Sequence, residues 1–153
     1  MTDLTDTDIR ADLIDNLRAC RAAERAIVTA LDPTIRDAPG PDDGWSPKDA
    51  MFHVAAWCAE AARQLERMRL GTYVDPLIES DAQNRAWFDL SQELDVPTVR
   101  AELHAARTKM RQEWCELGEH GELTSDAVEW FEESGHIHYR DHRRELLAWL
   151  DRI

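Results

Sequence analysis

Two histidines, His138 and His142, stand one helical turn apart near the end of the chain. At 100° per residue, the last predicted helix places both imidazoles on its apolar stripe. Viewed down the helix axis, Trp149 points in a direction between those of the two histidines. An i, i+4 pair directs two ring nitrogens toward a common point, which is the spacing used by metal sites on helices. The alternative is that both rings are core histidines, each hydrogen-bonded to a carboxylate.

A third histidine, His53, lies on an earlier predicted helix, at the edge of its apolar stripe and one turn before Trp57. It therefore faces a seam between helices and is a candidate third ligand. Three neutral imidazoles suit a divalent transition metal such as zinc, nickel or iron, with a position left for water. Such a metal lowers the pKa of bound water toward about 7, or holds a thiol as thiolate. The pattern predicts a catalytic site whose reacting group is metal-bound water or thiol.

Three carboxylates have the spacing to hold these imidazoles in one tautomer. Asp141 and Glu145 each follow a histidine of the pair by three residues, and Asp49 precedes His53 by four. The alternative for each is an ordinary solvated charge on a helix.

Several aromatic residues cluster in sequence around the proposed ligands. Trp57 and Trp87 each follow a polar candidate, His53 or Asn84, by one turn or less, and Trp130 precedes His138 by two turns. An aromatic cleft with a few polar groups is typical of small-molecule sites. The predicted substrate pocket contains Trp57, Asn84, Trp87, Trp130 and Tyr139. The alternative is that these rings fill the core of an alanine-rich bundle.

Apolar positions recur at helical spacing in four long segments, and no strand-like alternation competes with them. Four amphipathic helices in one domain must bury their stripes against each other, so we expect an all-α four-helix bundle. The connection between the second and third long helices is too long for a tight hairpin and predicts a crossover. The first two expected long helices span about 8–31 and Ser46 to near Gly71. The third runs from Val96 to a break at 118–121, and the fourth from Thr124 or Ser125 to the end, with a bend at Gly135. A short helix between the second and third begins with a capping box at 80–83 and ends near 93.

Composition limits the possible partners. The 153 residues contain 18 Lys and Arg against 31 Asp and Glu, a net charge of −13. Nucleic acid is not an expected partner, because phosphate binding relies on Lys and Arg. The three cysteines form no Cys-x-x-Cys motif, the first residues are acidic, and the most apolar stretch (50–62) is too short for a bilayer. We expect one cytoplasmic domain over residues 1–153, without a membrane partner.

Four sequence blocks occur together in the order of one known family. They are Trp45-Ser46-Pro47-Lys48-Asp49, Met51-Phe52-His53-Val54-Ala55-Ala56-Trp57, Asp81-Ala82-Gln83-Asn84-Arg85, and His138-Tyr139-Arg140-Asp141-His142 before Leu146-Leu147. Together they resemble the DinB-like four-helix bundle superfamily, and they are most similar to its ClbS/DfsB branch.

The resemblance implies an up-down-down-up bundle and a metal site at His53, His138 and His142. It also implies a thiol cosubstrate such as mycothiol, bacillithiol or glutathione, because several relatives are thiol-dependent transferases or isomerases. Dimers are common among relatives, so a homodimer is expected. The ClbS-like branch is associated with protection against a reactive genotoxin, and some of its members act without a metal.

These residues are compatible with three functional hypotheses. The first is a metal-dependent transferase or hydrolase that attacks a small electrophile in detoxification or stress protection. The second is a metal-free ClbS-like protein that binds or hydrolyses a small molecule. The third is a structural bundle whose imidazoles are core groups with satisfied hydrogen bonds.

Overall fold

The computed structural model describes residues 45–138, together with 11, 13–15, 17–22, 25, 29 and 141. The described residues between 11 and 29 are helical, and none of the described residues forms a strand. The elements with defined bounds are α3 (Pro47–Arg69), α4 (Ser80–Ser91), α5 (Val96–His120), α6 (Ser125–Glu132) and the π-helical turn η1 (Glu133–Ile137). None of the helices described is both long and apolar enough to span a membrane.

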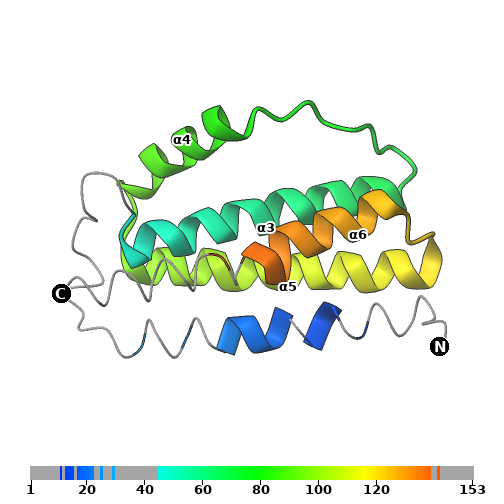
Figure 1. Cartoon of the computed structure of the whole chain (residues 1–153), viewed down its shortest axis with the longest axis horizontal. Helices are drawn as coiled ribbons and strands as arrows, with labels where there is room; N and C mark the ends of the chain where they lie inside the picture. Colours follow the sequence, from blue (N-terminus) through cyan, green and yellow to red (C-terminus); the bar gives the residue numbers. More distant parts are fainter. Residues whose placement is uncertain are drawn as a thin grey trace.

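The helices pack as a four-helix bundle with a crossover (Figure 1). Helices α3 and α5 run parallel and share the most extensive helix–helix contact. Helix α6 runs antiparallel to both, and the N-terminal helical residues lie on the other side of α5. Between α3 and α5 the chain returns along the bundle through an extended segment and α4. This is the predicted up-down-down-up order, and the fold class predicted from the sequence is confirmed.

The predicted start of α3 is confirmed in detail. The Ser46 hydroxyl accepts from the Asp49 backbone N–H at 3.2 Å, and the Asp49 carboxylate accepts from the Ser46 N–H at 3.0 Å. Pro47 occupies the first helical position, where a missing N–H costs nothing. This reciprocal cap determines where α3 begins, and with it the face on which His53 lies.

The end of α3 turns the chain into the crossover. Gly71 adopts a φ of 72°, a left-handed conformation that glycine adopts without steric cost. The Gly71 N–H donates to Met68 O and the Thr72 N–H to Arg67 O, which together form a Schellman motif. The sequence placed this end correctly near Gly71.

Helix α4 begins differently from the sequence prediction. The capping box expected at Ser80 is wrong: Glu79 is the N-cap residue, it makes no side-chain cap hydrogen bond, and Ser80 is the first residue of the helix. Contacts with α3 replace the missing cap, because Trp57 donates to Asn84 and Ser91 donates to Asp49. Tertiary contacts therefore hold this short helix, which ends at Ser91 rather than near 93.

Helices α5 and α6 begin where their polar caps predict. The Asp95 carboxylate accepts from the Thr98 N–H at 2.8 Å, and the Thr124 hydroxyl accepts from the Ala127 N–H at 3.2 Å. The hydrogen bond from Thr98 holds the pKa of Asp95 below its ordinary value. The break predicted at 118–121 lies further along the chain, since α5 continues to His120 and the non-helical residues before α6 are 121–124.

The core lies along the seam of α3 and α5, closed by α6. The Trp114 and Phe131 rings stack with centroids 4.4 Å apart at an interplanar angle of 19°. The apolar residues that recur at helical spacing along α5 are buried, except for the half-buried Ala106; the buried ones are Val99, Leu103, Met110, Trp114 and Leu117. This packing fixes the position of α6 and of the chain that follows it.

The cap of α3 can be tested by replacing Ser46 with alanine. We expect Ser46→Ala to lower the free energy of unfolding by about 1 kcal/mol, because the Asp49 N–H loses its acceptor. Urea denaturation followed by circular dichroism measures the change. Ser125→Ala is the control: Ser125 is exposed and follows the actual cap of α6, so its loss should have little effect. Equal destabilisation by both variants would contradict the assignment.

A buried carboxylate gives a pH-dependent prediction. Glu113 is 2% exposed and accepts from Lys109 at 2.7 Å and from Arg69 at 2.9 Å. Burial raises the pKa of Glu113, but the hydrogen bonds and charges of Arg69 and Lys109 outweigh burial, and the net pKa lies below its ordinary value. The Arg69–Glu113 ion pair links the end of α3 to α5.

A carboxylate with a lowered folded-state pKa stabilises the fold above its unfolded-state pKa, and this contribution is lost as pH falls through the folded-state pKa. We therefore expect Glu113→Gln to be less stable than the wild type at pH 7 and to lose stability less steeply below about pH 4.3. Urea midpoints measured from pH 7 to pH 3 test this. Parallel pH profiles for the two proteins would be the contrary result.

Candidate functional site

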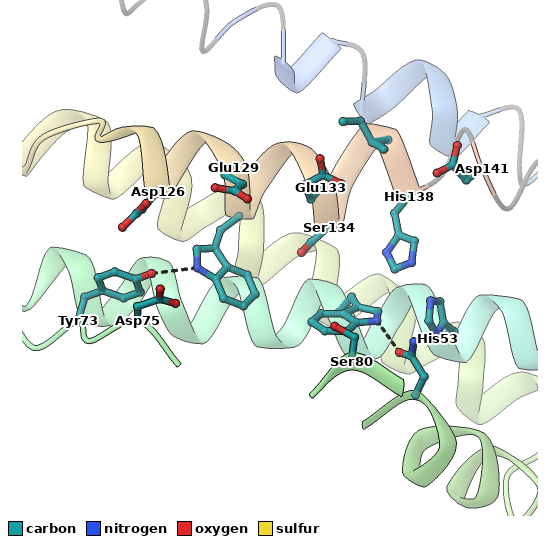
Figure 2. Close-up of a pocket in the computed structure, with 14 residues that line it drawn as sticks. His53, Tyr73, Asp75, Ser80, Asp126, Glu129, Glu133, Ser134, His138 and Asp141 are labelled. Atoms are coloured by element: carbon teal, nitrogen blue, oxygen red, sulfur yellow. Dashed lines mark hydrogen bonds between the residues drawn. The ribbon is translucent and has the colours of Figure 1, made fainter. Parts of the chain in front are cut away.

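Two of the three predicted ligands meet inside the bundle. The imidazole rings of His53, on α3, and His138, directly after η1, have centroids 4.6 Å apart and are nearly perpendicular at 79°. His53 is buried and His138 is half-buried. Figure 2 shows the two rings pointing toward one another from facing helices. The third predicted ligand, His142, lies outside the described residues.

The π-helical turn η1 positions His138. The helix is kinked within this turn, and the kink changes the direction of the residues after it. At its centre Gly135 leaves helical geometry, with φ −94° and ψ −112°, where the sequence predicted a bend. The Ser134 carbonyl accepts instead from the buried Cys58 thiol at 3.4 Å. The turn is thus attached to α3, just over one helical turn beyond His53.

Aromatic residues surround the His53 imidazole and connect α4 to α3. The Trp45 ring lies 4.4 Å from the His53 ring, centroid to centroid, at an angle of 49°. The Trp57 indole N–H donates to Asn84 Oδ1 at 2.9 Å. The rings of Trp57 and Trp87 are nearly perpendicular, with centroids 5.0 Å apart. Trp57, Asn84 and Trp87 therefore come together as predicted, although Trp87 supports the wall from behind instead of lining the larger cavity.

The two histidines form one end of a cavity of about 490 Å³. This volume lies within the range of small-molecule sites. The α6–η1 segment forms one wall, α3 another, and the crossover the third (Figure 2). The lining residues are His53, Trp57, Tyr73, Asp75, Ser80, Asn84, Asp126, Glu129, Trp130, Glu133, Ser134, Ile137, His138 and Asp141.

Some lining residues were missed by the sequence analysis. Tyr73 and Asp75 lie in the extended part of the crossover, where no periodic pattern could indicate which way they face. The Tyr73 hydroxyl accepts from the Trp130 indole N–H at 3.3 Å and so ties the crossover to α6. Asp126 and Glu133 were detectable, because with Trp130 they follow one another at spacings of four and three residues on one helical face.

The cavity is polarised along its length. Figure 2 shows Tyr73, Asp75, Asp126 and Glu129 toward one end, with His53 and His138 toward the other. Five of the lining residues are carboxylates, and all five are exposed: Asp75, Asp126, Glu129, Glu133 and Asp141. The site therefore combines exposed carboxylates, aromatic walls and a pair of imidazoles at one end.

The carboxylates predicted to orient the imidazoles have different placements. Asp49 is buried, but its oxygens accept from the Ser46 N–H, the Ser91 hydroxyl at 3.0 Å and the Gln92 amide at 2.9 Å. It ties the start of α3 to the end of α4. Asp141 also lines the cavity, and it follows His138 by three residues in the sequence. Glu145 and the predicted pocket residue Tyr139 lie outside the described residues.

The separation of the two imidazoles is compatible with a shared metal ion. Metal–nitrogen bonds of about 2 Å place the ring centroids of two ligands of one ion roughly 5 Å apart, close to the observed 4.6 Å. Nitrogen donors of this kind suit zinc, nickel and iron. Within the part of the chain that is described, no three His, Cys, Asp or Glu side chains are grouped closely enough to hold an ion. The structure thus brings together two of the donors for such a site.

One comparison with known proteins bears on the architecture. A solved structure described as "Crystal structure of TT2238, a four-helix bundle protein" matches with a TM-score of 0.65 and 23% sequence identity, over 91% of this chain and 98% of that chain. This chain is a four-helix bundle. No family model matches the sequence, and neither does a curated protein. The likeness shows the fold alone.

The role of the Trp57–Asn84 hydrogen bond in holding α4 can be tested by substitution. We expect Asn84→Ala to destabilise α4 and speed hydrogen exchange of its backbone amides, because the Trp57 N–H loses its acceptor and helix α4 has no side-chain cap of its own. Hydrogen-exchange mass spectrometry over residues 80–91 measures the effect. Asn84→Asp keeps an oxygen at the same position and serves as the control. Unchanged exchange in Asn84→Ala would refute this role.

Proposed function

We propose that this chain is a metal-dependent enzyme of the DinB-like superfamily, acting on a small electrophilic substrate in detoxification or stress protection. The observation that carries the proposal is the meeting of His53 and His138, from distant parts of the sequence, at one end of a cavity of about 490 Å³. The proposed metal ligands are His53, His138 and His142. The class of reaction is a transfer or a hydrolysis.

The metal supplies a Lewis acid that makes water or a low-molecular-weight thiol nucleophilic at neutral pH. The chain supplies the positioning. The Cys58–Ser134 contact holds the π-helical turn against α3 and so holds His138 opposite His53. The Trp45 ring packs on His53 and limits the orientations of its imidazole. Preorganised donors of this kind bind a metal without a large reorganisation of the protein.

The rest of the cavity supports a small organic substrate. Trp57 and Trp130 provide apolar surface against which a compact molecule can be desolvated. Both indole N–H groups are already engaged, by Asn84 and Tyr73, so their ring faces and edges remain for contact. These features agree with a thiol cosubstrate and an electrophile as reactants.

The sequence blocks support the ClbS/DfsB branch, and the four-helix bundle agrees with the fold of that superfamily. From the same resemblance we propose a cytoplasmic homodimer. The net charge of −13 does not favour nucleic acid as a partner.

A second candidate is a metal-free protection protein of the ClbS-like kind. It is favoured by the direct contact of the two imidazoles inside an aromatic setting, since two neighbouring rings can divide the roles of general base and general acid. In this case the cavity binds or hydrolyses its ligand without an ion.

Metal content tests the main proposal. We expect untagged protein purified from cells to contain close to one divalent transition metal per chain by elemental mass spectrometry. His53→Ala and His138→Ala should each lose most of it, because each removes one nitrogen donor. His120→Ala is the matched control, since His120 is exposed at the end of α5. No metal in the wild type, even after incubation with zinc, nickel or iron salts, would contradict the proposal.

A chelator separates the two candidates. The probe is the conjugation of 1-chloro-2,4-dinitrobenzene with glutathione, in which the thiolate sulfur bonds to the ring carbon and chloride leaves. Under the main proposal, turnover falls on chelation and returns with metal. Under the second candidate, binding of the electrophile measured by Trp fluorescence survives chelation and is lost in Trp57→Ala.

A further inference from the structure

A second cavity, of about 310 Å³, lies between the N-terminal helical residues and α5. It is separate from the histidine cavity, which is formed by α3, the crossover and the α6–η1 segment. Figure 1 shows the N-terminal helical residues on the side of α5 away from α4. Its lining residues are Arg21, Arg25, Thr29, Met51, Arg100, Leu103, His104 and Arg107.

The polar lining comes from two helical faces, and Met51 of α3 adds apolar surface. Arg100, His104 and Arg107 follow one another at spacings of four and three residues, so they share a face of α5. Arg21, Arg25 and Thr29 are spaced by four residues on the opposing helical segment. The contact of Arg21 Nη2 with His104 Nδ1, at 3.1 Å, joins the two faces. The arginines thus approach one space from two sides.

The polar lining offers hydrogen-bond donors. Four guanidinium groups, one hydroxyl and one imidazole line the cavity, and its described lining includes no carboxylate. Because Arg21 Nη2 can only donate, His104 Nδ1 accepts in this contact, and the neutral ring then carries its proton on Nε2. Guanidinium groups present paired N–H donors that match the oxygens of phosphate.

Two of these charges repel each other within one helical segment. Arg21 and Arg25 form a like-charge i, i+4 pair, which is unfavourable for that segment on its own. The chain carries 18 basic residues against 31 acidic ones, yet four of the 18 line this one cavity. Arg25 and Arg100 are exposed, and neither forms a salt bridge with the residues that the structure describes. A bound anion would offset the repulsion.

We infer that this cavity binds a small phosphate-bearing anion with two linked phosphoryl groups, of the pyrophosphate class. The size of the cavity is at the lower end for ligand sites and admits such a group, whereas a net charge of −13 opposes contact with an extended polyanion. Arg25 and Arg100 approach the anion from the two helical faces, and Arg107 forms the buried side.

Calorimetric titration with inorganic pyrophosphate tests the inference on the full chain at constant ionic strength. We expect saturable binding to the wild type, weakened about tenfold or more by Arg100→Gln and by Arg25→Gln. Arg67→Gln is the matched control: Arg67 is exposed on α3, does not line the cavity, and its replacement changes the net charge equally. Because the three arginines are exposed, thermal melts should show that all variants fold.

Four outcomes would overturn the inference. The first is an absence of binding to the wild type at millimolar pyrophosphate. The second is equal weakening by Arg67→Gln, which would indicate a general effect of charge. The third is loss of binding in His53→Ala with retention in Arg100→Gln, which would place the anion on a metal in the other cavity. Tighter binding of a single-stranded DNA oligonucleotide, lost in Arg100→Gln, would likewise overturn the small-anion assignment.

Discussion

The parallel packing of α3 against α5 is the constraint on which the rest of the architecture depends. Two helices that are consecutive along the bundle seam and point the same way cannot be joined by a hairpin. The chain must return along the length of the bundle, and it does so over α3, through the extended segment after Gly71 and then α4 (Figure 1). This returning segment contributes Tyr73, Asp75, Ser80 and Asn84 to the histidine cavity. The cavity is thus a consequence of the topology as much as of any local motif.

A second constraint acts at the other wall. A regular α-helix through residues 125–138 would continue without interruption, with its carbonyls bonded within the helix. Here Gly135 departs from helical geometry, and the Ser134 carbonyl accepts a hydrogen bond from the Cys58 thiol. A buried thiol that packs like a small apolar residue therefore also fixes the register of His138. The imidazole pair is held by backbone geometry on one helix and by a capped start, Ser46 with Asp49, on the other.

The sequence predicted those features whose causes are local. The cap at Ser46, the starts of α5 and α6 and the bend at Gly135 each depend on a few neighbouring residues, and each is present. The start of α4 was predicted wrongly because hydrogen bonds to α3, between Trp57 and Asn84 and between Ser91 and Asp49, hold this helix in place of a local cap. Asp49 has the sequence spacing of a carboxylate partner for His53. Its oxygens instead accept hydrogen bonds from the N-cap residue Ser46 and from the end of α4. Tyr73 and Asp75 face the cavity from irregular chain, where spacing carries no information. His142, Glu145 and Tyr139 fall outside the described residues.

The crossover differs from the other walls of the cavity in how it is attached. It is anchored by the glycine turn after α3, by the Trp57–Asn84 and Trp130–Tyr73 bonds, and by the Asp49 carboxylate, while the bundle core beneath it is closed by α3, α5 and α6. The entropy of closing a loop rises only slowly with its length. Residues between these anchors can therefore be inserted, deleted or exchanged with little loss of bundle stability. The same helical frame can in this way be adapted to ligands of different shape by changing a single exposed segment.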